Sequence, residues 1–317
     1  MQSIREVAFA KYHAAGNDFI VVSAAELGIR GPGPGSRSKR LGVLARAILD
    51  RHTGVGADGL FVVSQALDPK HHAVVRIFNA DGSEAEMSGN GIRCAAAWLV
   101  EASPDLRRLD IETAAGVKVV ELIRREPGEI VFRIAMGEPI LDPKRIPFHG
   151  EGAVAPVVRY RLPTSLGQRE VTVTSMGNPH CSMFVDCFDD FDWRALGREI
   201  ERHPLFPKRT NVEFIRAIGR KEIEVRFWER GVGETASSGT GSSAAAVASV
   251  LNGHTERRIK VNTPGGTLDV EWSRSNQVFL TGPVRRIARG RFDYREAARS
   301  ESVRRGRPKR PKKETGS

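Results

Sequence analysis

Short apolar runs separated by glycine-rich turns mark the first half of the chain. Three of these runs are bounded by Gly, Asn or Asp and predict strands at residues 19–22, 60–63 and 74–78. Between the first two runs, residues 40–50 repeat Leu and Ile at the spacing of one helical face. The first half is therefore predicted to mix strands with helices.

A polar, glycine-rich turn followed by an alanine-rich segment occurs twice. Ser-Gly-Asn-Gly at residues 88–91 precedes the alanine-rich residues 92–100, and Ser-Gly-Thr-Gly at residues 238–241 precedes residues 242–248. Alanine is the strongest helix former, so each turn is predicted to begin a helix. Residues 88–91 and 238–241 are called the two Ser-Gly-x-Gly turns below.

The match between the two turns extends to their surroundings. Glu84 and Glu234 each lie four residues before the serine of their turn. A Gly-Asn pair also occurs earlier in each half, at residues 16–17 and 177–178. The same signals in the same order indicate two related domains that face each other across a cleft.

Each Ser-Gly-x-Gly turn has features of an anion site. Backbone N–H groups at a helix N-terminus are free, and glycine leaves them unshielded, so they favour a carboxylate or a developing negative charge. Ser88 and Ser238 precede these glycines and point into the same space, where a nucleophile or base gains from the positive potential. Two such turns suit a reaction that needs one group on each side of a carbon. The alternative is that both serines are ordinary helix N-caps.

The composition excludes several classes of protein. Of the 317 residues, 40% are hydrophobic, and no apolar run approaches the roughly 20 residues of a membrane span. The first ten residues lack the features of a signal peptide. The three cysteines are scattered and form no Cys-x-x-Cys pair, and the histidines lack metal-ligand spacing. We expect a protein of the cytoplasm without a metal site.

The excess of basic residues is concentrated at the C-terminal end. Lys and Arg number 49 against 38 Asp and Glu, and residues 301–317 hold seven basic residues against two acidic ones. Residues 295–317 are predicted to be a disordered tail, because so few apolar side chains cannot offset the entropy of ordering. Four residues resemble the core of an AT-hook, which lies in the minor groove of A·T-rich DNA: Arg305, Gly306, Arg307 and Pro308. The two interpretations are weak DNA binding and a solvated tail that adds solubility.

Six blocks of sequence together resemble the diaminopimelate epimerase family. The blocks are residues 11–19 (KYHAAGNDF), 54–59 (GVGADG), 79–87 (NADGSEAEM), 177–180 (GNPH), 209–212 (RTNV) and 229–235 (ERGVGET). They follow one another in the order of the family and, with the segments between them, cover about residues 5–290.

The resemblance implies both a fold and an activity. The fold is α/β, with two pseudo-symmetric domains, each a curved, mainly antiparallel, barrel-like sheet around a central helix. We place the N-terminal domain at residues 1–133 plus about 284–294, and the C-terminal domain at residues 134–283. The implied activity is a cofactor-free inversion of the α-carbon of LL-diaminopimelate to the meso form, in lysine and peptidoglycan precursor synthesis. We also expect a homodimer.

The chain departs from the family at the catalytic positions. Members carry a cysteine just before each Gly-x-Gly, one thiolate removing the α-proton and the other thiol delivering a proton to the opposite face. This chain has Ser88 and Ser238 at those positions. An alcohol titrates far above a thiol and needs an adjacent base. His180 and Glu229 are the candidates, because the corresponding family residues lie beside the two thiols.

Neither of two cysteines near these positions is expected to replace the thiols. Cys94 lies almost two turns into the first predicted helix. Cys181 follows His180 and could approach the cleft, but the family does not use that position as a base.

Four interpretations of the serines stay open at this point. Each serine relays a proton to His180 or Glu229, or those two residues act on the α-carbon directly. Alternatively, the chain binds a diamino acid without turning it over. The fourth is that both cysteines were engineered to serine to trap a complex.

The resemblance carries substrate-binding roles onto a larger set of residues. These are Asn17, Asn79, Gly89, Asn90, Asn178, Asn211, Glu229, Arg230, Gly239 and Thr240. Arg230 can clamp a carboxylate with two N–H groups, and Glu229 can pair with an ammonium group. For any single asparagine, the alternative is a turn residue that satisfies its own backbone. Gly59 stands where some members have a glutamine that reaches substrate, so that contact is lost.

Overall fold

The computed structural model describes residues 4–29, 36–66, 68–85 and 87–295. The elements of the first half are β1 (Ile4–Ala14), β2 (Asn17–Ser23), α1 (Ser36–Leu49), β3 (Gly59–Ser64), β4 (Ala73–Asn79), β5 (Glu84–Ala85), α2 (Gly89–Ala102), β6 (Arg108–Thr113), β7 (Gly116–Glu126) and β8 (Glu129–Gly137). Those of the second half are β9 (Val157–Thr164), β10 (Gly167–Ser175), β11 (Pro179–Phe184), α3 (Trp193–Glu201), β12 (Asn211–Gly219), β13 (Glu222–Glu229), β14 (Gly233–Thr235), α4 (Gly239–Leu251), β15 (Arg258–Thr263), β16 (Gly266–Trp272) and β17 (Val278–Arg295).

The strands and helices expected in the first half are confirmed. The three predicted strands form β2, β3 and β4. The predicted helix at residues 40–50 is α1, which begins earlier, at Ser36, and buries Leu41, Leu44 and Ile48. Both Ser-Gly-x-Gly turns begin helices, α2 and α4.

The order of strand pairing in the first half is repeated in the second. β2 pairs in parallel with β3, β3 is antiparallel to β4, β4 is parallel to β6, and β6, β7 and β8 follow as antiparallel neighbours. The same sequence of pairings runs from β11 through β12, β13, β15 and β16 to β17. The expected pseudo-symmetry is therefore confirmed.

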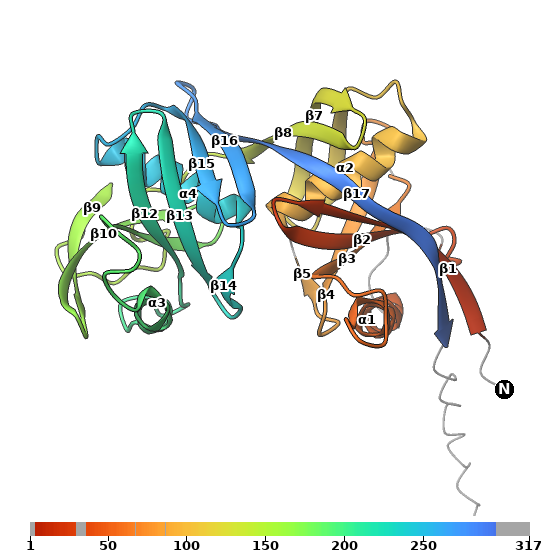
Figure 1. Ribbon diagram of the computed structural model, residues 1–317, viewed down its shortest axis with the longest axis horizontal. Helices are drawn as coiled ribbons and strands as arrows, with labels where there is room; N and C mark the ends of the chain where they lie inside the picture. The colour runs from red at the N-terminus through yellow and green to blue at the C-terminus, as the bar shows by residue number, and fades with distance from the viewer. Residues whose placement is uncertain (1–3, 30–35, 67, 86, 296–317) are drawn as a thin grey trace, which may run out of the picture.

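One long strand, β17, joins the two halves (Figure 1). It pairs with β16 and β8 at its start and with β1 from Arg285 to Arg295. In this way it closes the first half into a barrel of eight strands in the described residues: β1, β2, β3, β4, β6, β7, β8 and β17. The domain boundaries at residues 133 and 284 stay a prediction, and both lie within strands that cross between the halves.

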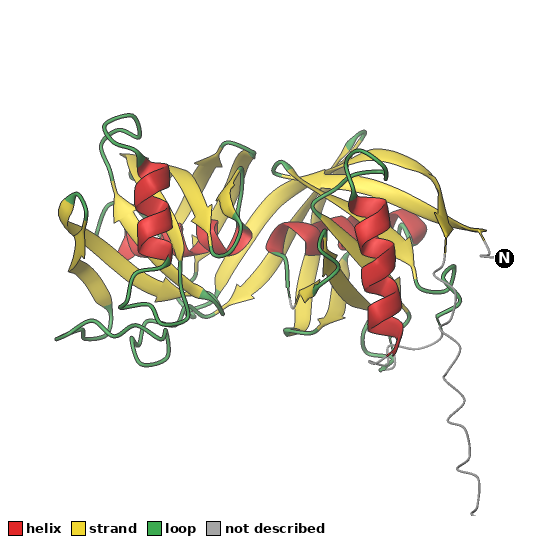
Figure 2. Ribbon diagram, turned by 90° about the horizontal axis from the view of Figure 1, so that it is seen from below, coloured by secondary structure: helices red, strands yellow, loops and turns green. Residues whose placement is uncertain are grey.

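Each half encloses one alanine-rich helix, and each has a second helix on its outside. Ala95 to Ala97 in α2 and Ala244 to Ala245 in α4 are fully buried. Small side chains allow the surrounding strands to approach these helices closely, and a helix that is apolar on all sides must be buried. α1 and α3 lie on the outer surface of their halves and cover separate apolar clusters (Figure 2). The two central helices share a single apolar core, which continues from one half into the other.

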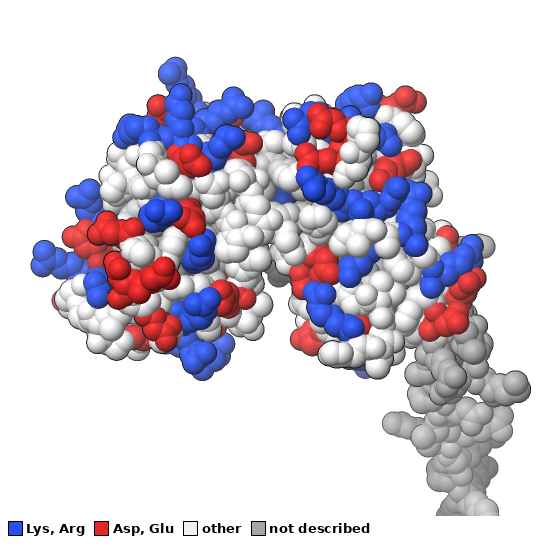
Figure 3. Space-filling view, in the orientation of Figure 1, with Lys and Arg blue, Asp and Glu red and all other residues white. Residues whose placement is uncertain are grey.

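The surface carries both signs of charge, and Lys and Arg gather along β17 (Figure 3). Four arginines of this strand are already paired: Arg285 with Glu129, Arg286 and Arg289 with Glu101, and Arg291 with Glu6. Arg295, which we assigned to the tail, is the last residue of β17. The rest of the tail, with its AT-hook-like residues, lies outside the described residues. No helix in the described part of the chain is long and apolar enough to cross a membrane.

Candidate active site

The N-termini of the two central helices meet end to end between the halves. A β-carbon added to Gly89 would lie 3.3 Å from the Cα of Gly239, and one added to Gly239 would lie 3.2 Å from the Cα of Gly89. Only glycine at both positions gives this approach without displacing the backbone. The second residue of each Ser-Gly-x-Gly turn is therefore required by the packing of the two domains.

A cavity of about 600 Å³ opens at this junction, and both serines line it. Ten of the thirteen residues proposed from the sequence line the same cavity: Asn17, Ser88, Gly89, Asn90, Asn178, Glu229, Arg230, Ser238, Gly239 and Thr240. Residues more than 200 positions apart in the sequence thus contribute to one site. This is the arrangement that a reaction on two faces of one carbon requires.

Both serines act as helix N-caps, as the alternative interpretation expected. Ser88 Oγ accepts the Gly91 N–H at 3.1 Å, and Ser238 Oγ accepts the Gly241 N–H at 3.2 Å. Both residues have the extended backbone typical of an N-cap. A serine can cap its helix and line the cavity at the same time, because the cap holds the hydroxyl oxygen at the helix N-terminus, where the cavity opens.

The two hydroxyl groups differ in their surroundings. Ser238 Oγ donates to Glu229 Oε2 at 3.0 Å, and the other carboxyl oxygen of Glu229 accepts the hydroxyl of Thr235 at 2.7 Å. Burial raises the pKa of Glu229 above its ordinary value, although these hydrogen bonds oppose the shift. In the described residues, no carboxylate or imidazole contacts Ser88 Oγ. Among the described residues, the site therefore pairs one hydroxyl beside a carboxylate of raised pKa with one that has no base beside it.

His180 does not line the cavity. Its ring is fully buried, with Nδ1 2.6 Å from Glu213 Oε1 and Nε2 2.9 Å from Asn178 Oδ1. Glu213 Oε2 also accepts the hydroxyl of Ser182. Both ring nitrogens lie beside side-chain oxygen atoms, so the buried ring holds Asn178 in place from behind the cavity lining.

Two of the predicted substrate asparagines lie outside the cavity lining. Asn79 is exposed at the end of β4 and donates to Ser83 Oγ. Asn211 is buried, and its amide donates to the Pro179 carbonyl and accepts the backbone N–H of Arg230. Asn211 thus uses its side chain on the backbone that carries Arg230.

The cavity also has lining residues that sequence reasoning missed. Lys118 on β7 and Glu138 just after β8 are charged residues of this kind. Glu138 is held by the side-chain amides of Asn276 and Gln277, whereas Lys118 has no partner among the described residues. No motif surrounds either residue, and only the tertiary structure brings the start of β7 and the end of β8 to the junction.

None of the three cysteines lines this cavity, and Cys181, which could have approached the cleft, does not. Cys94 is fully buried, and burial raises the pKa of its thiol to about 12. Cys181 is likewise buried in the core beneath α3, and burial raises its pKa well above the ordinary value. Cys187 is exposed and lines a different cavity.

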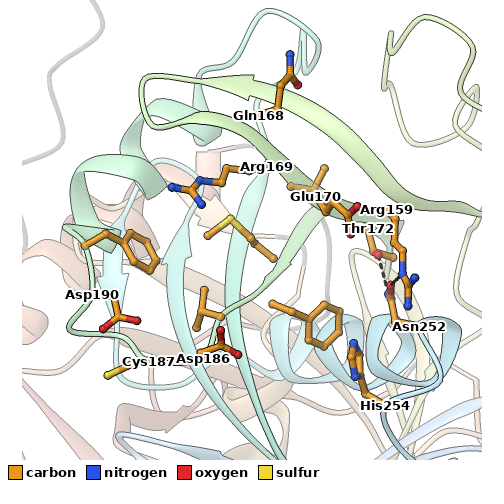
Figure 4. Close-up of a pocket in the computed structure, with 15 residues that line it drawn as sticks. Arg159, Gln168, Arg169, Glu170, Thr172, Asp186, Cys187, Asp190, Asn252 and His254 are labelled. Carbon is orange, nitrogen blue, oxygen red and sulfur yellow. Dashed lines mark hydrogen bonds between the residues drawn. The ribbon is translucent and has the colours of Figure 1, made fainter.

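That second cavity, of about 570 Å³, lies at the C-terminal end of α4 (Figure 4). There Asn252, the C-cap of the helix, donates to Thr172 Oγ1 at 2.8 Å and accepts from Arg159 Nε at 3.4 Å. None of the residues proposed from the sequence lines it. Across the described residues, no group of three or more His, Cys, Asp and Glu side chains is arranged to hold a metal ion.

Comparison with known proteins agrees with the geometry. A family model described as diaminopimelate epimerase matches residues 9–141 and 171–287. A diaminopimelate epimerase of Pelotomaculum thermopropionicum is 43% identical over 289 residues, which cover 90% of this chain and 99% of that protein. One from Desulfitobacterium hafniense is 41% identical, with 88% and 96% covered.

Solved structures share the fold at much lower identity. A hydroxyproline epimerase from Agrobacterium vitis matches with a TM-score of 0.64 at 16% identity, covering 92% of this chain and 94% of that one. A Bacillus anthracis phenazine biosynthesis protein of the PhzF family matches with a TM-score of 0.61 at 15% identity, covering 90% and 99%.

Proposed function

The chain belongs to the diaminopimelate epimerase family, and we propose that it is an isomerase that inverts the α-carbon of LL-diaminopimelate to give the meso form. The observation that carries this proposal is the single cavity at which the two helix N-termini and both serines converge. Arg230 and Glu229 line the same cavity and supply one cation and one anion for a substrate with two carboxylates and two ammonium groups.

The reaction is a proton exchange at one carbon. A base on one face removes the α-proton, the electron pair left behind spreads into the carboxylate, and an acid on the opposite face returns a proton to the carbon. The backbone N–H groups of the two helix N-termini favour the negative charge that develops on the carboxylate. The net result is inversion with no other atom gained or lost.

The hydrogen bond between Ser238 and Glu229 supports a base on one face. Glu229 can accept the hydroxyl proton of Ser238, and its raised pKa makes it a stronger base than an exposed carboxylate. Ser88 is then the group on the opposite face. Its hydroxyl is polarised by the α2 N-terminus, which favours an alkoxide there over one in water.

A second candidate function is binding of a diamino acid without turnover. The lack of a basic partner for Ser88 in the described residues favours it. The two candidates are separated by incubating the chain with diaminopimelate in heavy water and following the α-proton by NMR. Exchange supports the epimerase, and binding without exchange supports the second candidate. Restoration of exchange by Ser88→Cys with Ser238→Cys would assign the loss to the missing thiols alone.

The wider setting follows from the same proposal. An epimerase of this type serves lysine and peptidoglycan precursor synthesis, a role that fits the cytoplasm, and we propose that the chain acts as a homodimer. The tail remains a separate proposal. If its AT-hook-like residues bind DNA, affinity will fall steeply with salt and will vanish on truncation after Asp293.

A further inference from the structure

Arg93 is a buried cation that has no carboxylate partner among the described residues. Its side chain is fully buried on α2, and within the described part of the chain its Nε and Nη1 atoms have no hydrogen-bond partner. Burial lowers the pKa of this guanidinium to about 10, so it still carries its charge at neutral pH. Burying an unpaired charge destabilises a folded protein, so such a residue calls for an explanation beyond stability.

The one hydrogen bond of Arg93 leads into the candidate active site. Its Nη2 donates to Asn90 Oδ1 at 2.8 Å, and Asn90 Nδ2 donates to Asn17 Oδ1 at 3.0 Å. Asn17 Nδ2 in turn donates to Asp58 Oδ2 at 2.8 Å. These four residues are called the Arg93–Asp58 relay below. Its two middle members, Asn17 and Asn90, both line the cavity.

The ends of the relay dictate its direction. An arginine side chain can only donate hydrogen bonds, and an ionised carboxylate can only accept them. An amide does both, so a chain of amides between neutral neighbours could run either way. With Arg93 at one end and Asp58 at the other, only one direction satisfies every link. Arg51 Nη2, 2.8 Å from Asp58 Oδ1, holds the carboxylate end in place.

The direction determines what the cavity lining offers to a ligand. The oxygen atoms of Asn17 and Asn90 accept bonds within the relay, and one N–H of each amide is also used there. The second N–H of Asn90 points to Ser237 Oγ at 3.4 Å, and that of Asn17 has no partner among the described residues. Among the described residues, both N–H groups of Asn90 are therefore taken, and the one amide N–H left for a ligand is on Asn17, which suits a carboxylate oxygen.

We propose that the Arg93–Asp58 relay fixes which atoms of the two amides face the cavity, with Arg93 and Asp58 as positioning residues for a substrate carboxylate. The ligand class rests on the proposed function, whereas the orientation of the amides does not. The buried charge of Arg93 is then explained: it forces Asn90 to present its N–H side to Asn17 and to the opposite domain.

The first experiment tests the relay without a substrate. The chain has eight asparagines, so the side-chain amide signals of ¹⁵N-asparagine-labelled protein can be resolved and assigned by single substitution. Asp58→Asn is expected to shift the signals of both Asn17 and Asn90, although Asn90 does not contact Asp58. The control Asp110→Asn removes a surface carboxylate that accepts from Arg108, and it should shift neither signal. A shift of Asn17 alone would overturn the relay.

The second experiment measures affinity for diaminopimelate in the parent chain, Asp58→Asn, Arg93→Met and the double variant. Each single substitution is expected to weaken binding by about 3- to 10-fold, the range for one lost hydrogen bond. The affinity of the double variant should equal that of whichever single variant binds diaminopimelate less tightly, because the two substitutions break the same relay. Losses that multiply would mean that the two residues act independently, which contradicts the proposal.

Stability separates positioning from a structural role. Arg93→Met replaces a buried charge by an apolar side chain of similar length, so its unfolding temperature should not fall, even though its affinity does. A fall in both together would contradict the proposal. A parent chain that binds no diaminopimelate would overturn the proposed function, and the amide signals would still decide the relay.

Discussion

Gly89 and Gly239 meet at the junction of the two domains, each so close to the other that a β-carbon on either would come within 3.3 Å of the partner's Cα. These glycines belong to the two Ser-Gly-x-Gly turns, so the contact sets how far apart the two serines lie. The geometry of the candidate active site therefore depends on having glycine, which has no β-carbon, at both positions.

Substituting either glycine should separate the helix N-termini. Gly239→Ala places a methyl group against the backbone of Gly89 and is expected to lower the rate of α-proton exchange by about tenfold or more, because small displacements of catalytic groups are costly. The overpacking should also cost about 1–3 kcal/mol of unfolding free energy. Gly219→Ala is the matched control, because a β-carbon there meets nothing within 4 Å. Equal rates in Gly239→Ala and the control would refute the contact's role.

Glu229 should make the protein less stable as the pH rises. Burial raises its pKa in the folded state, so folding favours the protonated form. The stabilising effect is complete below the ordinary pKa of glutamate and is lost as the pH rises through the raised value. Glu229→Gln removes this component, so its unfolding free energy should fall less than that of the parent between pH 4 and pH 8, measured by urea titration. The same substitution should abolish exchange if Glu229 is the base.

Glu201 should give the opposite pH dependence. Burial acts to raise its pKa, but hydrogen bonds from Trp228 Nε1 and the Gly231 backbone N–H outweigh burial and hold the pKa below its ordinary value. The contribution of Glu201 to the free energy of unfolding is present above the ordinary pKa of glutamate, and it is lost as the pH falls through the lowered pKa.

Truncating Glu201 should therefore lower the free energy of unfolding, because its carboxylate holds the residues on both sides of Arg230. Glu201→Ala leaves the buried Trp228 Nε1–H and the backbone N–H of the exposed Gly231 without their acceptor and is expected to cost about 1–3 kcal/mol of unfolding free energy at pH 7. The surface substitution Glu256→Gln, which removes only an exposed pair with Lys221, should stay within about 0.5 kcal/mol. Similar losses in both variants would show that the buried contacts of Glu201 add nothing.

Thiols placed at the two serine positions should titrate differently. A thiol at a helix N-terminus has a lowered pKa, but a neighbouring carboxylate raises it again. Ser238→Cys places the thiol beside Glu229, whereas Ser88→Cys does not. Both variants are made in a background of Cys187→Ser, which removes the exposed cysteine. As the pH is raised, the rate of alkylation by iodoacetamide should begin to rise at a lower pH for Ser88→Cys than for Ser238→Cys. Coincident pH profiles would mean that Glu229 does not act on position 238.

Most of the site could be found from the sequence because its signals are local. A serine followed by glycine-x-glycine and an alanine-rich run specifies a capped helix N-terminus wherever it occurs, and the repeat of that signal implies two matching domains. The lining residues that were missed, and the predicted residues outside the lining, had no such local signal. Lys118 reaches the cavity only because the tertiary structure brings the start of β7 to the junction, and Asn211 directs its amide to the backbone at Pro179 and Arg230.

The amino-acid order by itself determined which segments become the two central helices and where they begin, since capping and helix propensity act over a few residues. The distance between the serines was decided only when the halves packed, because it depends on a contact between glycines 150 positions apart. The difference between the two hydroxyls was decided by the folding of the second half alone. Glu229 reaches Ser238 from the end of β13, while no base from the first half reaches Ser88 in the described residues.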